Sequence, residues 1–195
     1  LDNRQKYETI DGSLYRVILD EDFSKIQNLN KNIFADCYAL QSWAKNSEVA
    51  RANYKIEDGC LKLIIDENAG LWAEDSSNRV SGITTAKRNG LHPNTASRKV
   101  IYESNTPYKT FTEKFLGLIM QYGRLEIKCK IPYGYDHMCA FWMLGIQDNI
   151  EQTVEIDVFE NSTGRNNKIS YPNFHTMYNT TLGTGTNSSF PQQIN

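Results

Sequence analysis

The lack of helical periodicity is the feature of this sequence that most limits its fold. No segment repeats apolar residues at the spacing that three turns of an amphipathic helix require. Instead, residues 122–131 alternate strictly, with charged side chains on one face and apolar side chains on the other. This period of two is typical of a half-exposed strand. Further apolar runs predict strands at Tyr15–Leu19, Cys60–Ile65, Val80–Ala86, Met138–Leu144, Val154–Glu160 and Phe174–Asn179.

Polar connections separate these runs, such as the turn at residues 57–59 and the turn at residues 132–136. Many short strands with such connections favour an antiparallel β-sandwich, so we expect an all-β fold. A chain of 195 residues is long enough to bury a core, and we expect one domain over residues 1–195. The long polar loop at residues 88–114 is of the kind that often carries function.

Charge and hydropathy exclude some classes of partner. The net charge is -2 and no basic stripe is present, so we expect no nucleic-acid partner. No apolar run is long enough to span a bilayer, so we expect no membrane partner.

The four cysteines lack the Cys-x-x-Cys spacing of zinc sites, so we expect no metal site of that kind. Cys60 and Cys129 fall within apolar-patterned runs and are predicted to be buried free thiols. A disulfide between Cys129 and Cys139 across a hairpin is the alternative left open.

An acidic pattern in residues 155–160 carries the main functional hypothesis. Glu155 and Asp157 are two residues apart and share one face of a strand, whereas Glu160 would face the other side of a regular strand. One β-bulge, with Phe159 as the expected bulge residue, would bring Glu160 to the same face. Ile156 and Val158 would then enter the core. An exposed acidic strand without any chemistry is the alternative interpretation.

Three such carboxylates suit the retaining cleavage of a glycosidic bond. One carboxylate attacks the anomeric carbon, and a second, about 5 to 5.5 Å away, protonates the leaving oxygen. A third acid between them can raise the pKa of the neighbour that must keep its proton, and can hydrogen-bond the nucleophile.

The chain resembles glycoside hydrolase family 16, whose bulge-containing branch carries its catalytic residues in a Glu-x-Asp-x-x-Glu motif. The resemblance extends beyond that motif, in the same order along the chain, from about residue 15 to residue 180. The segments that carry it are Leu19–Phe23 with Trp43, Glu57–Leu61, Ser81–Thr85, Tyr122–Pro132 and Ala140–Leu144.

The resemblance implies a jelly-roll sandwich of the concanavalin type, with Glu155 as nucleophile, Asp157 as helper and Glu160 as acid/base. It also implies that Trp142 forms the floor of the sugar site and that His175 lies near the cleaved bond. For Trp142 the alternative is an ordinary core residue, and for His175 it is a structural hydrogen bond.

Arg124 and Asn53 match positions that contact sugar hydroxyls in relatives, although each is equally compatible with a surface or turn residue. We expect no cofactor. A structural calcium is the alternative, because Glu21 and the carbonyl of Gly59 resemble part of the family's site.

The sequence departs from laminarinase-like relatives in two places. The approach at residues 146–154 lacks their Trp-Pro and glycine, and Met138 and Cys139 stand where they have another Trp-Pro. These differences weaken a β-1,3-glucan specificity. Relatives also continue with further strands, so we expect the C-terminal strands of the sandwich to be missing here.

Together these features predict a retaining endo-glycoside hydrolase that cleaves a β-glucan or β-galactan. A transglycosylase on the same scaffold and a non-catalytic carbohydrate-binding sandwich are the alternatives. The resemblance also implies a polysaccharide partner, a monomer, and an extracellular or cell-surface location.

Overall fold

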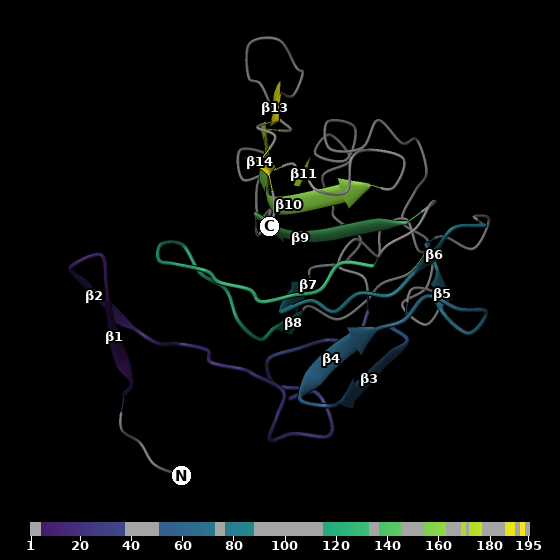
Figure 1. Ribbon diagram of the computed structural model, residues 1–195, viewed down its shortest axis with the longest axis horizontal. Coiled ribbons are helices and arrows are strands. Elements are labelled where there is room, and N and C mark those ends of the chain that lie inside the picture. The colour runs from purple at the N-terminus through teal and green to yellow at the C-terminus, as the bar shows by residue number, and fades with distance from the viewer. Residues whose placement is uncertain are drawn as a thin grey trace. The chain divides into compact units, whose positions relative to one another are not determined.

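The computed structural model describes residues 5–37, 51–72, 77–87, 115–132, 137–145, 154–162, 169–170, 172–176, 186–189 and 192–193. Every helix or strand assigned within these residues is a β-strand, as the all-β prediction requires. None of these residues belongs to a helix with the length and apolar character of a membrane span. The strands pair into small antiparallel sheets (Figure 1). Their closure into a sandwich stays a prediction.

The chain falls into two compact units, which we describe separately. The first contains residues 1–91 and 108–125, and the second contains residues 92–107 and 126–195. A single domain over residues 1–195 therefore stays a prediction.

The first unit is built from two-stranded antiparallel sheets. Their strands are β1 (Tyr7–Ile10) with β2 (Ser13–Arg16), β3 (Tyr54–Glu57) with β4 (Cys60–Leu63), β5 (Gly70–Leu71) with β6 (Arg79–Val80), and β7 (Ala86–Lys87) with β8 (Phe115–Leu116).

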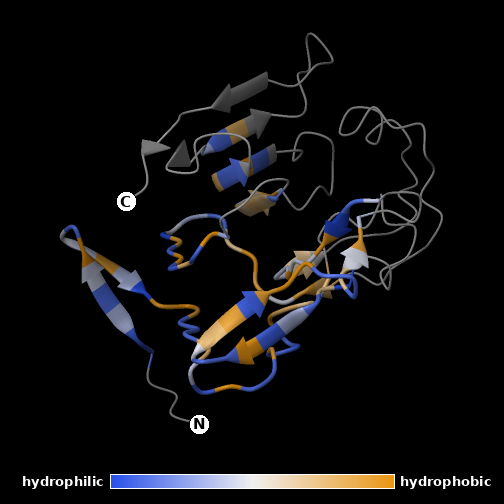
Figure 2. Ribbon diagram, turned by 45° about the vertical axis from the view of Figure 1, so that its right-hand side comes forward, coloured by the Kyte–Doolittle hydropathy of each residue, from blue (hydrophilic) through white to orange (hydrophobic). Residues whose placement is uncertain are grey.

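Two of these hairpins turn on an Asp-Gly pair. Asp58 and Gly59 have φ angles of 54° and 68°, and Asp11 and Gly12 have φ angles of 51° and 80°. Positive φ at both central residues defines the type I′ turn, whose twist matches that of the flanking strands. The predicted turn before Cys60 is confirmed, and hydrophobic and hydrophilic residues mix along β3 and β4 (Figure 2). The hairpin of β1 and β2 was not predicted, although its Asp-Gly signal is present in the sequence.

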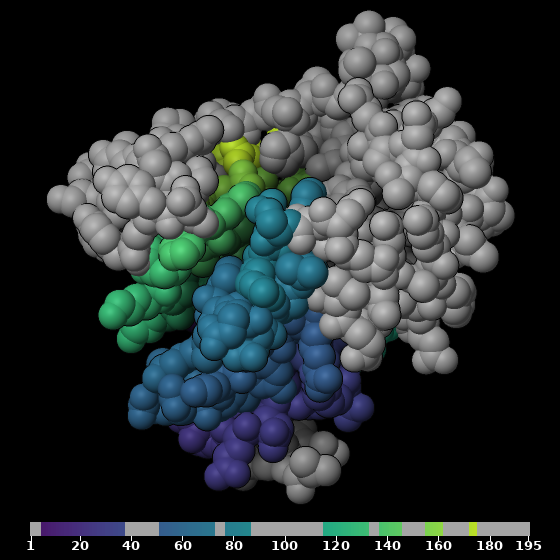
Figure 3. Space-filling model, turned by 90° about the vertical axis from the view of Figure 1, so that its right-hand side faces the viewer, coloured from purple at the N-terminus to yellow at the C-terminus, as the bar shows by residue number. Residues whose placement is uncertain are grey.

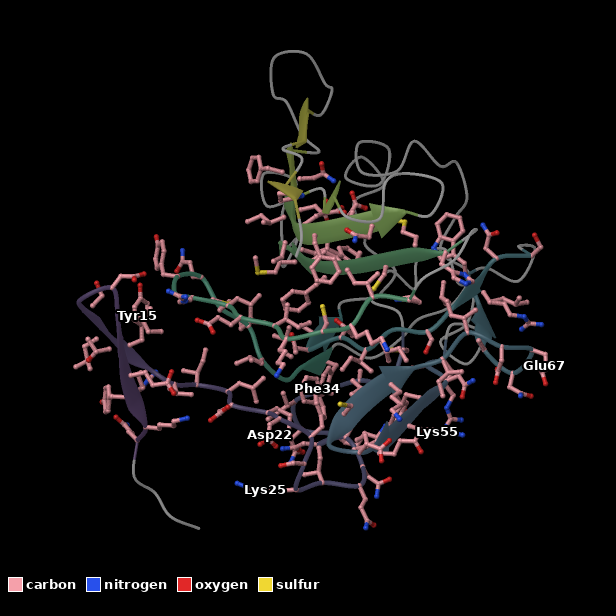
Figure 4. The ribbon with its side chains drawn as sticks, in the orientation of Figure 1. Tyr15, Asp22, Lys25, Phe34, Lys55 and Glu67 are labelled. Atoms are coloured by element: carbon pink, nitrogen blue, oxygen red, sulfur yellow. The ribbon has the colours of Figure 1, made fainter. Side chains whose placement is uncertain are left out.

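The buried apolar residues of the first unit are Leu29, Phe34, Cys37, Ala52 and Ala69. Phe34 is only 6% exposed, whereas Lys25, Lys55 and Glu67 are exposed (Figure 4). Backbone pairing joins Ala35 to Thr84 and Cys37 to Arg51. Residues 51–72, coloured blue, consequently pack against the purple N-terminal segment (Figure 3).

The second unit contains the largest sheet, a four-stranded antiparallel sheet in the order β13-β12-β10-β9. The predicted strands at residues 138–144 and 154–160 are confirmed, and the one predicted from residue 174 is found as β12. The strands of the sheet are β9 (Met138–Leu144), β10 (Val154–Ser162), β12 (Asn173–Thr176) and β13 (Thr186–Ser189). A separate pair joins β11 (Ile169–Ser170) to β14 (Gln192–Gln193).

Three predictions about strands and burial are wrong. Residues 122–131 form no strand, and Leu125 and Ile127 are 38% and 46% exposed. Alternation holds a strand only where a neighbouring backbone pairs with it, and none of the described strands forms a ladder with this segment. The run at residues 80–86 forms strand only at its two ends. Cys60 and Cys129 are exposed rather than buried, Cys60 in the two-stranded β3–β4 hairpin and Cys129 within the unpaired segment.

Candidate active site

A β-bulge in β10 brings the three acids into register on one face of the sheet. Glu155 lies opposite Leu144 of β9, Asp157 lies opposite Trp142, and Glu160 lies opposite Ala140. The three partners are spaced by two residues along β9, so they share one face, and the three acids share it with them. We call this surface the acid face.

The bulge is confirmed, but its residue is Val158 rather than Phe159. The register shifts between Asp157 and Phe159, which leaves Val158 without a cross-strand partner. Phe159 stays opposite Phe141, and their ring centroids are 6.3 Å apart. A contact between aromatic rings favours keeping that pair in register, so the smaller Val158 becomes the extra residue.

The most buried side chains described in this unit are polar. Asp157 is 2% exposed, Asn161 is 6% exposed and Asn173 is 8% exposed. Buried polar groups are uncommon and require partners, since burial without a hydrogen bond is unfavourable. The concentration of such groups on adjacent strands marks this sheet as the candidate site.

The opposite face of the sheet is partly exposed, contrary to prediction. Ile156 was expected to be buried, but it is 40% exposed, and Phe174, directly opposite it on β12, is 43% exposed. The described residues leave much of both side chains uncovered. Val158 is half-buried.

Trp142 and His175 both occupy positions beside the acids. Trp142 is half-buried and lies directly across from Asp157, which places it on the acid face. The backbone of His175 pairs with that of Glu155. The structure therefore brings together five of the seven predicted site residues, whereas their roles toward a sugar stay predictions.

Asn53 and Arg124 belong to the first unit. The half-buried Asn53 donates its Nδ2–H to Asp66 Oδ1 at 2.8 Å, and its carbonyl accepts a hydrogen bond from the hydroxyl of Ser81 at 2.5 Å. Arg124 Nη1 lies 3.3 Å from Asp11 Oδ2 in an exposed ion pair, a contact of little energetic weight. Sugar binding by either residue stays a prediction.

One residue of the site was not found from the sequence. Asn173 lies opposite Asp157 at the start of β12, and its Nδ2–H donates a hydrogen bond to Glu160 Oε2. The sequence signal was a polar residue two positions before His175, which would share its face of a strand.

The calcium hypothesis gains little from the described residues. Glu21 Oε1 accepts a hydrogen bond from the backbone N–H of Phe23 at 2.8 Å. No group of three or more Asp, Glu, His or Cys residues suited to a metal ion occurs in the described part of the chain. Calcium takes six to eight oxygen ligands, so Glu21 and the Gly59 carbonyl alone are too few to hold it.

The four cysteines, all within the described residues, are not joined in disulfides. Partial burial raises the pKa of Cys129, which is otherwise exposed, and burial together with the nearby Cys129 raises the pKa of the half-buried Cys139. Low thiolate content makes both poor nucleophiles, so neither is a candidate for covalent catalysis.

Comparison with known proteins gives one informative likeness. No family model matches the chain, and no curated protein matches it. A solved structure named as a GlcNAcα1-4Gal-releasing endo-β-galactosidase from Clostridium perfringens is similar, with a TM-score of 0.63 and 24% sequence identity. The match covers 88% of this chain and 42% of that one. At this identity, the finding is that the chain shares the fold of part of that endo-β-galactosidase.

Proposed function

We propose that this chain carries the active site of a retaining endo-glycoside hydrolase that cleaves a β-linked polysaccharide. In this proposal Glu155 is the nucleophile, Asp157 its helper and Glu160 the acid/base. The observation that carries this proposal is the bulge at Val158, which places all three acids on one face of β10. The retaining route requires at least two carboxylates on the same face of the site.

The reaction proceeds in two steps. The carboxylate of Glu155 attacks the anomeric carbon while Glu160 gives its proton to the departing glycosidic oxygen, which leaves a glycosyl ester on Glu155. Glu160, now ionised, takes a proton from water, and the resulting nucleophile displaces Glu155 from the sugar. Two inversions at the anomeric carbon retain its configuration.

Asp157 suits the role of helper through its place between the two glutamates. Its side chain is 2% exposed, so its interactions with its neighbours are weakly screened by water. A carboxyl group there disfavours the simultaneous ionisation of both glutamates, which helps Glu160 to hold its proton until a sugar binds.

Two observations favour a β-galactan over a β-glucan. The solved structure with a similar fold is named an endo-β-galactosidase. The sequence also lacks the Trp-Pro and glycine that laminarinase-like relatives carry before the catalytic strand. Trp142, on the acid face beside Asp157, would offer its ring to the apolar face of a sugar.

The test compares Glu155→Gln and Glu160→Gln with the wild-type protein on β-galactans, agarose, carrageenan, laminarin and mixed-linkage glucan. Each variant should lose at least about 100-fold in kcat, since each lacks a group used directly in bond cleavage. Glu126→Gln, which changes an exposed glutamate of the same unit, serves as the control. Proton NMR of the first products should reveal retained anomeric configuration.

Other outcomes would separate the alternatives. Products elongated by an added oligosaccharide acceptor would identify a transglycosylase. Saturable binding without any cleavage, equal in all variants, would identify a carbohydrate-binding sandwich. Inverted products would contradict the assigned roles.

A further inference from the structure

Asn173 has a position in the sheet that gives it access to Glu160. Strand β12 pairs with β10 only from Val154 to Asp157, and Asn173 forms the last of these pairs, with Asp157. Beyond Asp157, the bulge begins, and the described register of β10 continues along β9. Asn173 is therefore the last β12 residue of this ladder, at the end from which β10 continues toward Glu160.

From this position the side chain of Asn173 reaches the carboxyl group of Glu160. It is 8% exposed, and its Nδ2–H donates to Glu160 Oε2. The donor therefore comes from a strand next to that of the acceptor, and it fixes a glutamate side chain that otherwise has three rotatable bonds. The hydrogen bond is partly withdrawn from water, which increases its strength.

We infer that Asn173 is a positioning residue that holds Glu160 Oε2 and thereby orients the carboxyl group that delivers a proton to the leaving sugar oxygen. This inference rests on the proposed function, because it assumes that Glu160 is the acid/base.

The amide of Asn173 suits both protonation states of Glu160. A protonated carboxyl group has one O–H donor and one carbonyl oxygen that accepts hydrogen bonds. The amide N–H donates to Oε2, so it is compatible with the neutral and with the ionised carboxyl group. The amide itself does not titrate, so it can hold the carboxyl group in both steps without competing for the proton. When Glu160 is ionised, the same N–H stabilises the carboxylate.

The first test is the kinetics of Asn173→Ala, with Asn161→Ala as matched control. Asn161 is a similarly buried asparagine of the same sheet, but it pairs with Cys139 and so faces away from the acids. For substrates with poor leaving groups, kcat of Asn173→Ala should fall about 10- to 100-fold, as expected for a lost hydrogen bond to a charged group. The basic limb of its pH profile should move up by about one pH unit, because the carboxylate loses its donor.

The second test varies the leaving group. An aryl glycoside with a highly acidic phenol needs no proton to depart, so Asn173→Ala should form the glycosyl-enzyme at nearly the wild-type rate. A purely structural defect would slow both substrate types equally. Asn173→Gln, which keeps the amide, should recover more activity than Asn173→Ala.

A readout independent of activity keeps this inference separate from the proposed function. Carboxyl carbon NMR, assigned with Glu160→Gln, should show Glu160 titrating at higher pH in Asn173→Ala than in wild type. If the wild type has no glycosidase activity but the titration shifts, the proposed function fails while the hydrogen bond is upheld. If Asn173→Ala matches Asn161→Ala in kinetics and in the titration of Glu160, the inference is overturned.

Discussion

Two single-residue deletions in β10 test whether Asp157 must share the acid face with the glutamates. Val158 has no cross-strand partner, so deleting it closes the bulge and leaves Glu160 opposite Ala140. Ile156 pairs with Met143 on one side and with Phe174 on the other. Its deletion leaves the same spacing between the two glutamates, so both can stay opposite Leu144 and Ala140 once the bulge closes. Asp157 then takes the place of Ile156 opposite Met143 and turns to the other face, because successive strand residues alternate.

The expected magnitudes follow from the register. Without Val158, Glu155 and Glu160 still lie opposite Leu144 and Ala140, and the loss of a half-buried valine costs about 1 kcal/mol of unfolding free energy. We expect kcat within about tenfold of wild type, because all three acids remain on one face. Without Ile156, Asp157 faces the wrong side, while the two glutamates keep their partners on β9. We expect about a 100-fold loss, as for the misplacement of a group that positions the reacting carboxylates.

The assay is kcat on the cleaved polysaccharide, with circular dichroism and thermal denaturation to confirm that both variants fold. The two deletions are matched, since each removes one branched aliphatic residue from the same strand. Equal activity in two folded variants would refute the argument that Asp157 must share the acid face with the glutamates, as would a deletion of Ile156 that is more active than a deletion of Val158.

Two further predictions concern other parts of the chain. A Cβ at Gly117 would lie 2.7 Å from the carbonyl carbon of Ile33, against the 3.4 Å at which ordinary contact begins, and Gly117 also donates its N–H to Thr85. Gly117→Ala should therefore lower the free energy of unfolding by about 2–4 kcal/mol in a denaturant titration. In the control Gly12→Ala, the added Cβ meets no atom within 4 Å, so the loss should be about 1 kcal/mol, from the positive φ alone. Equal losses in the two variants would contradict this prediction. Because burial raises the pKa of the half-buried Cys139, its alkylation at neutral pH should be slower than in urea and should accelerate only at more alkaline pH than for a free thiol, as followed by mass spectrometry. Equal rates in urea and in buffer would contradict this.

Local signals in the sequence predicted much of the sheet that carries the candidate site. A continuous apolar run located β9, an alternation of acidic and apolar residues located β10, and the Asp-Gly pair before Cys60 located the hairpin of β3 and β4. The need for a bulge followed from the odd spacing of Glu155 and Glu160. These features depend on residues close together in the chain, so the sequence alone determines them.

The features that were missed depend on contacts between distant segments. The alternation at residues 122–131 predicts a strand, but it supplies no partner backbone. The choice of Val158 over Phe159 as bulge residue depends on the ring of Phe141 in β9. The contact from Asn173 to Glu160 joins residues that are 13 positions apart, and the register of β10 with β12 decides it. No local pattern reports that register.

The distribution of burial in this sheet is difficult to explain by stability alone. Asp157 is nearly inaccessible to solvent, whereas the apolar side chains of Ile156 and Phe174 are 40% and 43% exposed. Burying a carboxyl group between two other acids opposes folding, both because it loses hydration and because like charges on one strand face repel. A sequence selected only for stability would place an apolar residue at position 157. An unfavourable arrangement that is held in place by a bulge and by neighbouring strands is the pattern expected where stability has been given up for chemistry.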